Sequence, residues 1–462
     1  MNTDPINVLF VQHDASDIGG VAKVLIDLLA TLHPVKIRAT VILPTNGSLE
    51  EEFKKLNVEY IIIPSNIFPE RNSDGGFEYI SKLSERAEQI SKIIFDKKID
   101  IVHTHTIFPF EGSLSALKSG IPHILHIHSN CDDEIPAAIF FTLNISKSTI
   151  AKIYGILSDH IVTVSHNGAY YFKRNHILAP LKVIHNGINS DRFEKLSLPE
   201  PHNLPSIPID SPVFTSIGRI TESKNFFLFI YAAQLILNTT PNAYFLIVGP
   251  VGNLSYAEKL KKYIFVNNLQ NNIYFLGMRK DIPSILKHCT NIFIMSSDYE
   301  GLPLVTLEAM SAGIPVISTR CGGPEEIIEH KVSGFLVDKN DAEGIAKYAL
   351  ALLKDRELAC KIGETGRQRV IDHFTVETFA DNFYATYQQV IKQHDRFKQA
   401  DRLAVVETFL SLLSHNATLH EKVKLIDSRL KLLEQFSNRI TNNFIYHLFK
   451  KVYLFLTRQS AY

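Results

Sequence analysis

The 462-residue chain lacks a charge surplus, a paired cysteine pattern and a long apolar run. Its 48 basic residues balance its 48 acidic residues, which argues against a protein that binds nucleic acid through a basic surplus. The four cysteines show no metal-ligand spacing, so neither a zinc site nor a disulfide framework is expected. No apolar run reaches the roughly 18 residues that span a bilayer. A hydrophobic content of 45% excludes a disordered chain, which leaves a globular protein.

The first residues also lack the features of a secretion signal. The segment "INVLFVQHD" (6–14) predicts a buried strand, and neither a basic region nor a cleavage site precedes it. Together with the unpaired cysteines, this start predicts a cytoplasmic protein. Peripheral contact with the inner face of the plasma membrane is left open.

Strand-like and helix-like segments alternate twice along the chain. The first series runs from a strand at 8–12 to a strand at 160–165, and the second from 213–218 to 334–337. Between them, residues 196–212 carry five prolines and predict a linker. Such alternation predicts parallel sheets with helices on both faces, and two such domains would bind a ligand in the cleft between them. The predicted fold class is α/β, with two doubly wound, Rossmann-like domains.

The end of the chain lacks helix breakers. No proline follows Pro324 and no glycine follows Gly366, so a mainly helical extension is expected. Apolar residues at four-three spacing predict a hairpin with a coiled-coil-like seam; they are Leu403, Val406, Leu410 and Leu413, then Leu419, Val423, Ile426, Leu430, Leu433, Ile440 and Phe444. A homodimer or partner seam, an edge resting on an anionic membrane and simple packing all stay open. The predicted boundaries are domains at 1–195 and 213–375, a linker at 196–212, a helix returning to the first domain at 376–394, and the extension at 395–462.

The stretch "DYEGLPLVTLEAM" places Glu300 before a predicted helix and Glu308 inside it. Pro303 suits the first helical position, where a missing N–H costs nothing. The free N–H groups of Leu304 and Val305 at such a helix start attract anions, phosphate above all. Because helical side chains lean toward the helix N-terminus, the Glu308 carboxylate would lie about one turn behind that anion and could accept hydrogen bonds from a ribose diol. The stretch therefore indicates a nucleotide-sugar site, with a solvated helix start as the alternative.

A second stretch, "SIGRITESKN" (216–225), follows a strand with a glycine turn and two cations, Arg219 and Lys224. When a nucleoside diphosphate leaves, negative charge grows on its β-phosphate and must be neutralised by a divalent metal or by fixed cations. The chain has no D-x-D pair that would hold a metal. Arg219 and Lys224 are candidates for this role, and no metal or other cofactor is expected. Two ordinary surface cations are the alternative.

Glycines and histidines mark the ends of strands in the first series. Gly19 and Gly20 open a helix just after the first strand, where the backbone can approach a ligand closely. The segments "HTH" (103–105) and "HIH" (126–128) each end a strand, at the sheet edge where α/β proteins bind ligands. Strand alternation puts each pair of histidines on one face, but no carboxylate completes a metal-ligand set. Core or rim histidines are the alternative to a functional role.

Taken together, these stretches resemble the retaining nucleotide-sugar glycosyltransferases of GT-B architecture, specifically family four, over residues 6–393. The resemblance is carried by the E-x7-E pair Glu300 and Glu308 and by the "EAMSAGIPVISTRCGGPEEII" that follows. It implies that the Gly19 loop faces the diphosphate or the transferred sugar. It also implies that His128, six residues after a proline, lies beside the donor sugar and the acceptor.

Further roles follow from the resemblance alone. The backbone around Gly277 would hold the nucleobase, with Arg279 flanking it or lying on the surface. Segments 162–172 and 182–193 would approach the cleft from the first domain. Retention would come from front-side attack by the acceptor, because no nucleophile is evident. The implied catalytic residues are His128, Glu300, Arg219 and Lys224; the implied donor-binding residues are Gly19, Gly20, Arg219, Lys224, Gly277, Arg279, Glu300, Leu304, Val305 and Glu308.

The substrate class follows by analogy with the resembling family. UDP-hexose is the expected donor, with GDP- and ADP-sugars open. A glycan or lipid-linked acceptor in bacterial surface polysaccharide synthesis, such as lipopolysaccharide or capsule, is the expected partner. A sugar-nucleotide epimerase shares the architecture but would need acid and base carboxylates in the cleft. A catalytically silent, glycan- or partner-binding relative would have lost a cation or a glutamate of the site, yet all four are present.

Overall fold

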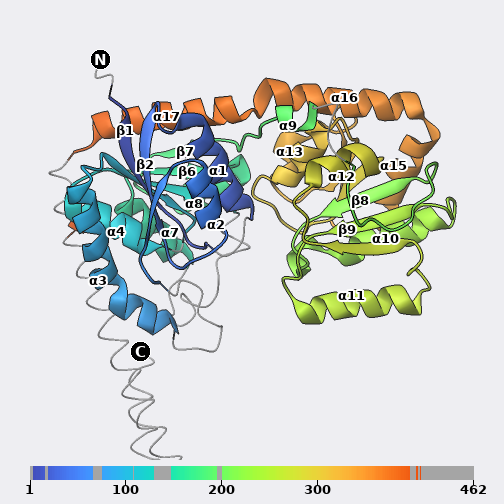
Figure 1. The fold of residues 1–462 in the computed structure, drawn as a ribbon, viewed down its shortest axis with the longest axis horizontal. Helices are drawn as coiled ribbons and strands as arrows, with labels where there is room; N and C mark the ends of the chain where they lie inside the picture. The colour runs from blue at the N-terminus through green and yellow to red at the C-terminus, as the bar shows by residue number, and fades with distance from the viewer. Residues whose placement is uncertain are drawn as a thin grey trace, which may run out of the picture.

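The computed structural model describes most of the chain: residues 4–15, 19–65, 75–107, 109–129, 147–194, 200–395, 402, 403 and 406. Two sheets lie side by side, one in each half of the described chain (Figure 1). Their connections alternate strand with helix, which is the arrangement that the apolar pattern predicts. The predicted α/β class with two Rossmann-like domains is confirmed.

The first sheet has seven strands, all paired in parallel, in the order β3-β2-β1-β4-β5-β6-β7. Its strands are β1 (Ile6–Val11), β2 (Ile37–Leu43), β3 (Glu59–Ile62), β4 (Ile101–His105), β5 (His123–Ile127), β6 (His160–Thr163) and β7 (Leu181–Val183). The helices of this domain are α1 (Gly20–Leu32), α2 (Leu49–Lys55), α3 (Gly75–Asp96), α4 (Phe110–Ser119), α7 (Lys147–Leu157), α8 (His166–Arg174) and α9 (Asp191–Glu194).

The second sheet has six parallel strands in the order β10-β9-β8-β11-β12-β13. Its strands are β8 (Val213–Ile217), β9 (Tyr244–Val248), β10 (Ile273–Gly277), β11 (Ile292–Met295), β12 (Val316–Thr319) and β13 (Phe335–Val337). Its helices are α10 (Phe226–Leu237), α11 (Leu254–Val266), α12 (Ile282–Cys289), α13 (Leu304–Ser311), α14 (Pro324–Ile327), α15 (Ala342–Lys354), α16 (Arg356–His373) and α17 (Val376–Gln393), and a 3-10 turn (Glu222–Lys224) precedes α10.

Alternate side chains of one strand pack into separate apolar clusters on the two faces of the sheet. Val8 and Phe10 of β1 join the apolar cluster that includes residues of α1 and α17, whereas Leu9 and Val11 join a cluster with residues of α3 on the other face. Successive side chains of a strand point to opposite faces, and a parallel sheet covered on both faces needs apolar residues on both. This is why the strands read as continuous apolar runs in the sequence.

Both sheets share a strand order in which the winding reverses beside the first strand, between β1 and β4 and between β8 and β11. Open α/β sheets bind ligands outside the carboxyl ends of the strands at such a reversal. Arg219 follows β8 and Glu300 follows β11, so the two stretches singled out by the sequence flank one reversal. His105 ends β4, beside the reversal of the first sheet.

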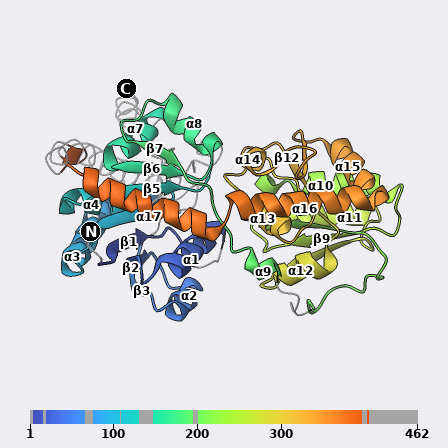
Figure 2. The ribbon, with the colours of Figure 1, turned by 90° about the horizontal axis from the view of Figure 1, so that it is seen from above.

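Helices α16 and α17 run end to end along one side of both domains (Figures 1 and 2). Helix α16 packs on α13, and α17 packs on α1. The buried hydroxyl of Tyr387 on α17 lies 2.7 Å from Nδ1 of His103 on β4. The chain therefore returns from the second sheet to the first and fixes both helices that border the site described below.

Most of the predicted helical hairpin, residues 407–462, lies outside the described residues. Of its upstream seam, Val406 is buried and Leu403 packs against the same cluster as Tyr154 of α7. Arg402 donates to the carbonyl of Ile156 and to Asp159. These three residues pack against the first domain itself. No helix of the described part is long and apolar enough to cross a membrane.

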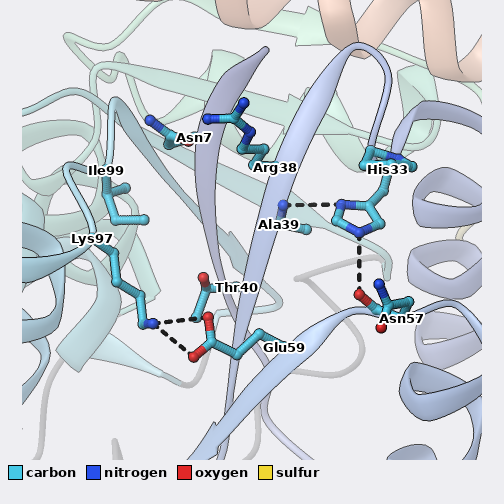
Figure 3. Close-up of a pocket in the computed structure, with 10 residues that line it drawn as sticks. Asn7, His33, Arg38, Ala39, Thr40, Asn57, Glu59, Lys97 and Ile99 are labelled. Atoms are coloured by element: carbon cyan, nitrogen blue, oxygen red, sulfur yellow. Dashed lines mark hydrogen bonds and ion pairs between the residues drawn. The ribbon is translucent and has the colours of Figure 1, made fainter.

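A pocket of about 470 Å³ lies at the amino ends of the first sheet's strands (Figure 3). Lys97 donates to both carboxylate oxygens of Glu59 at 2.6 and 2.8 Å across it. His33 accepts from the N–H of Ala39 beside the carbonyl of Asn57. Sheets of this kind bind ligands at the carboxyl ends of their strands, whereas this pocket lies at the amino ends. Its Lys97–Glu59 pair therefore serves as a control site in the experiments below.

Candidate functional site

Glu300 is anchored by Lys224 and Ser297. Lys224 Nζ lies 2.6 Å from Oε1 of Glu300, and the Ser297 hydroxyl donates to the same oxygen at 2.7 Å. The Glu300 side chain is 12% exposed. The pair joins the two stretches that the sequence selected separately.

The loops that carry this pair are tied together by their backbones. The N–H of Asp298 donates to the carbonyl of Ser223 at 2.9 Å, and the Ser296 hydroxyl donates to the carbonyl of Lys224 at 3.0 Å. Asn225 adopts a left-handed conformation, caps α10 with its side-chain oxygen and donates to Asp298. Lys224 and the segment before Glu300 are thus held in one rigid corner.

Helix α13 begins one residue later than the sequence predicts. Pro303 is the N-cap, with extended backbone angles, and not the first helical residue. A proline at that place still loses nothing, because an N-cap N–H needs no helical partner. No side chain caps this helix start. The N–H groups of Leu304 and Val305 are therefore oriented as an anion-binding end would require.

Glu308 is buried in α13 and forms an ion pair with Lys23 of α1. The ribose-binding role predicted for Glu308 thus falls on a carboxylate that already has a cation from the opposite domain. Burial lowers the pKa of Lys23 to about 8, while Asp27 raises it and Arg192 lowers it. Arg192 in turn donates to Asp27 at 2.8 Å. The ion pair therefore belongs to a chain of alternating charges that reaches α9.

Arg219 lies where the two domains meet. A Cβ on Gly19 would be 3.8 Å from Nη2 of Arg219, so this glycine brings the α1 loop directly against the guanidinium. Burial, opposed by Asp14 and assisted by Arg219, lowers the pKa of His13 to about 4. Gly20 has no atom within 4 Å of where its Cβ would be. The predicted diphosphate residues Gly19 and Arg219 are therefore neighbours.

His128 meets the loop of Glu300 at Gly301. A Cβ on Gly301 would overlap the carbonyl oxygen of His128, so only glycine permits this approach. Burial, and then His105 and His13, lower the pKa of His128 well below its ordinary value. The imidazole is accordingly neutral near pH 7. The structure thus brings the backbone of His128 against the loop that carries Glu300.

The predicted nucleobase residues lie at the end of β10. Gly277 has a positive φ of 65° and nothing within 4 Å of its Cβ position, so the turn needs glycine and leaves open space beside it. The Arg279 guanidinium donates to both oxygens of Asp281, at 2.8 and 2.6 Å, and to the carbonyl of His202. This guanidinium is thus held by its own loop, and its role beside a base stays a prediction.

Two segments of the first domain reach the second, as the resemblance implies. Asn186 donates to the carbonyl of Leu302 at 3.1 Å. The N–H groups of His166 and Asn167, at the start of α8, donate to Glu326 of α14. Burial acts to raise the pKa of Glu326, but these N–H groups and His185 at 2.8 Å lower it below its ordinary value.

Sequence reasoning missed several of these partners. Lys23, His185, Ser297 and Glu326 were not singled out, and His105 was noted without a partner, although each now contacts a candidate residue or the opposite domain. Lys23 stood one turn after the Gly19–Gly20 pair, and His105 stood in the "HTH" motif. Spacing alone offered these signals, but only the fold shows what they contact.

Comparisons with known proteins agree with this geometry. The family model described as Glycosyltransferase Family 4 matches residues 18–192, and that described as Glycosyl transferases group 1 matches residues 202–369. The Escherichia coli protein named UDP-Gal:alpha-D-GlcNAc-diphosphoundecaprenol alpha-1,3-galactosyltransferase is 27% identical over 331 residues, 68% of this chain and 81% of that protein.

A further relative supports the same family, and a solved structure supports the fold. An uncharacterized glycosyltransferase of Methanocaldococcus jannaschii is 32% identical over 282 residues, 58% of this chain and 67% of that protein. The solved structure of Anabaena HepE in complex with UDP-glucose matches with a TM-score of 0.67 at 19% identity, over 83% of this chain and all of that one. The family models and the Methanocaldococcus jannaschii relative show the family, and the solved structure shows the fold. The chain belongs to glycosyltransferase family 4, with the GT-B fold, and is a glycosyltransferase.

Proposed function

We propose that this glycosyltransferase moves a hexose from a UDP-linked donor to a hydroxyl of a glycan or lipid-linked glycan, with retention and without a metal. The observation that carries the proposal is the Lys224–Glu300 pair in the loop before α13, whose next residue, Gly301, lies against the backbone of His128 in the other domain. The names of two relatives agree with this substrate class, since one includes UDP-Gal and a diphosphoundecaprenol-linked sugar and the other was solved with UDP-glucose.

The donor would bind mainly to the second domain. The N–H groups of Leu304 and Val305 and the Arg219 guanidinium would hold the diphosphate. Glu308 would accept hydrogen bonds from the ribose diol after exchanging its contact with Lys23. The open turn at Gly277 would admit the base. The N–H groups of Leu304 and Val305 are fixed by the start of α13, which is what preorganised binding requires, whereas Glu308 must first exchange a partner.

The leaving diphosphate would be neutralised by Lys224 and Arg219. Charge grows on the β-phosphate as its bond to the anomeric carbon breaks, and two fixed cations stabilise that charge without the reorganisation that mobile water needs. Glu300 keeps Lys224 in place and would accept a hydrogen bond from a sugar hydroxyl. No metal enters this scheme.

Retention would come from attack on the face that the phosphate leaves. The acceptor oxygen forms a bond to the anomeric carbon while the bond to the phosphate oxygen breaks, and the hydroxyl proton passes to that phosphate oxygen. Gly19 and the neutral His128 would close over the donor sugar from the first domain and exclude water, which otherwise competes as acceptor.

A lipid-linked acceptor would place the enzyme at the cytoplasmic face of a membrane, in the synthesis of a surface polysaccharide. Truncation after Val406 tests whether the predicted hairpin makes the contact, because Arg402 and Val406 pack on the first domain and should be kept. Loss of binding to anionic vesicles would support a membrane edge, and loss of a dimer on a sizing column would support a partner seam. If neither changes, the segment serves only in packing.

A panel of UDP-, GDP- and ADP-sugars tests the proposed function directly. Thermal stabilisation identifies the donor, and slow donor hydrolysis without acceptor separates an enzyme from a silent relative. Lys224→Met and Glu308→Gln should each abolish most of that hydrolysis, whereas Lys97→Met, in the pocket of Figure 3, should not. Donor binding with no hydrolysis or transfer would favour the silent relative.

A further inference from the structure

Nδ1 of His105 lies 2.9 Å from Nε2 of His128. The ring centroids are 5.0 Å apart and the ring planes differ by 14°, so the rings meet edge to edge in nearly one plane. That is the geometry of a hydrogen bond between two imidazoles, one donating and one accepting. From this contact we infer that His105 is a positioning residue that holds His128 in the tautomer with its proton on Nδ1.

The direction of this hydrogen bond follows from burial. If His128 donated, neutral His105 would carry its proton on Nε2, and that atom is buried without a partner among the described residues. A buried N–H with no acceptor is rare and costly. His105 therefore donates from Nδ1, and His128 accepts at Nε2. Burial lowers the pKa of both imidazoles well below the ordinary value, so both are neutral.

His103 holds the ring of His105, the donor of this hydrogen bond, in place. Its ring stacks on that of His105, with centroids 4.4 Å apart and planes 14° apart, and its Nδ1 lies 2.7 Å from the hydroxyl of Tyr387. The ring of Phe383 of α17 also stacks on that of His103, with centroids 5.1 Å apart. Helix α17 thus fixes the stack, and the stack fixes the ring that contacts His128.

The same stack argues against a metal site, although nitrogens of His103, His105 and His126 lie within 4.8 Å of one another. A metal ion lies close to the plane of each imidazole that binds it. The parallel planes of His103 and His105 share no such point near their nitrogens. The cluster is better suited to orient a ring than to bind an ion.

The consequence concerns the atom that His128 offers to substrate. Its Nε2 is occupied by His105, whereas its Nδ1 has no partner among the described residues and, unlike both nitrogens of His126, is not sealed from solvent. His128 therefore presents a neutral N–H donor, suited to a sugar hydroxyl oxygen or to an oxygen of the leaving phosphate. This catalytic meaning rests on the proposed function; the tautomer itself does not.

The test is the tautomer of His128 in the full chain labelled with ¹⁵N-histidine. Long-range proton–nitrogen correlation spectra distinguish protonated from bare ring nitrogens, and the His128 signals are identified by their loss in His128→Gln. We expect Nδ1 protonated and Nε2 bare in the native protein. In His105→Phe, Nε2 of His128 no longer accepts a hydrogen bond, so we expect the Nε2-protonated tautomer, which free neutral imidazoles prefer, to appear beside the native one. In His105→Asn, whose amide can donate from a similar place, the native tautomer should persist.

Matched variants separate positioning from folding. His103→Phe removes a buried histidine of the same strand and face without touching His128, so its tautomer should stay native. Turnover should fall about 10- to 100-fold in His105→Phe and recover to within about threefold in His105→Asn, with donor KM nearly unchanged, as for other residues that orient a reacting group. Nucleotide binding confirms that each variant is folded.

Two results would overturn the inference. One is His128 protonated on Nε2 in the native protein, which decides the matter even where a variant fails to fold. The other is a tautomer that is unchanged in His105→Phe. A native tautomer in a protein that turns over no nucleotide sugar would instead contradict the proposed function and leave the hydrogen-bond direction standing.

Discussion

Lys23 of α1 and Glu308 of α13 form an ion pair that joins the two domains. The Glu308 side chain is 5% exposed and that of Lys23 is 31% exposed. The two residues are 285 positions apart in the sequence. Because Glu308 is the carboxylate proposed to bind ribose, a nucleotide that binds there must compete with Lys23. Donor binding and the contact between the domains are thereby coupled.

Removal of Lys23 should separate these two effects. Lys23→Met leaves a buried carboxylate without its cation, which should lower the free energy of unfolding by about 1–3 kcal/mol, less than for a fully buried pair because Lys23 is partly exposed. The same change removes the competitor for ribose, so UDP should raise the melting temperature more in the variant than in the native protein. Differential scanning calorimetry with and without UDP measures both.

Lys97→Met is the matched control, since it breaks an exposed pair with Glu59 in the pocket of Figure 3. It should cost well under about 1 kcal/mol and leave the UDP shift unchanged. A smaller UDP shift in Lys23→Met than in the native protein would show that Lys23 aids nucleotide binding and does not compete with it.

Lys224 and Glu300 should behave as one unit. Lys224→Met and Glu300→Gln should each lower kcat by about 10²- to 10³-fold, the range seen when a group that stabilises developing charge is removed. Since the two side chains contact each other at 2.6 Å, the double variant should lose little more than the worse single variant. Steady-state donor hydrolysis measures all three. Fully additive losses would mean that Glu300 does not act through Lys224.

Gly301 should tolerate no side chain. In Gly301→Ala the new methyl group would overlap the His128 carbonyl oxygen, which should push the domains apart and lower turnover by about 10²-fold, as small misplacements of reacting groups do. Donor binding should change far less, because the proposed donor contacts lie mainly in the second domain. Gly20→Ala controls for folding alone, since nothing lies within 4 Å of its Cβ position; Lys97→Met is the control for turnover, because Gly20 is itself a predicted donor-binding residue. Native turnover in Gly301→Ala would place the reacting centre away from this contact.

The ion pairs of Asp159 should make the free energy of unfolding fall at acid pH. Burial acts to raise its pKa, but His394, Arg402 and the N–H of His123 lower it from 3.8 to about 2. The folded carboxyl binds its proton more weakly than the unfolded one, so its stabilisation is complete above about pH 4 and is lost as the pH falls through about 2.

The lowered pKa of Asp159 corresponds to a contribution of about 2 kcal/mol to the free energy of unfolding near neutral pH. Asp159→Asn should therefore lower the free energy of unfolding at about pH 6 and change it little at about pH 2. Urea denaturation at the two pH values checks this. An equal loss at both would assign the effect to packing and not to the charge.

Local pattern was enough to predict most elements and to select residues that the fold brings close together. The helix predicted to open at Gly19 and Gly20 is α1, which begins at Gly20, because an apolar series with a glycine start specifies a helix without distant partners. Glu300 and Lys224 were selected from two short motifs, and the strand order brings both to one sheet edge. The start of α13 was wrong by one residue, since sequence alone does not separate an N-cap proline from a first-turn proline.

What the sequence could not supply is the identity of distant partners. His105 meets His128, and Lys23 meets Glu308, only because parallel strands and two domains place them side by side. Periodicity tells which face a residue occupies and not which residue lies opposite. Arg279 shows a local partner that was also missed: Asp281, only two positions away, accepts hydrogen bonds from its guanidinium, for which a place beside the base and a place on the surface had both been left open.

The most direct test of metal-free nucleotide binding is calorimetric titration of UDP, then GDP and ADP, into the native protein in excess EDTA. If fixed cations and a buried carboxylate grip the nucleotide, binding should persist without metal. It should weaken by about tenfold or more in both Lys224→Met and Glu308→Gln, and remain native in Lys97→Met. Binding that requires a divalent ion, or that is equally tight in all three variants, would contradict the claim that fixed cations and a buried carboxylate hold the nucleotide.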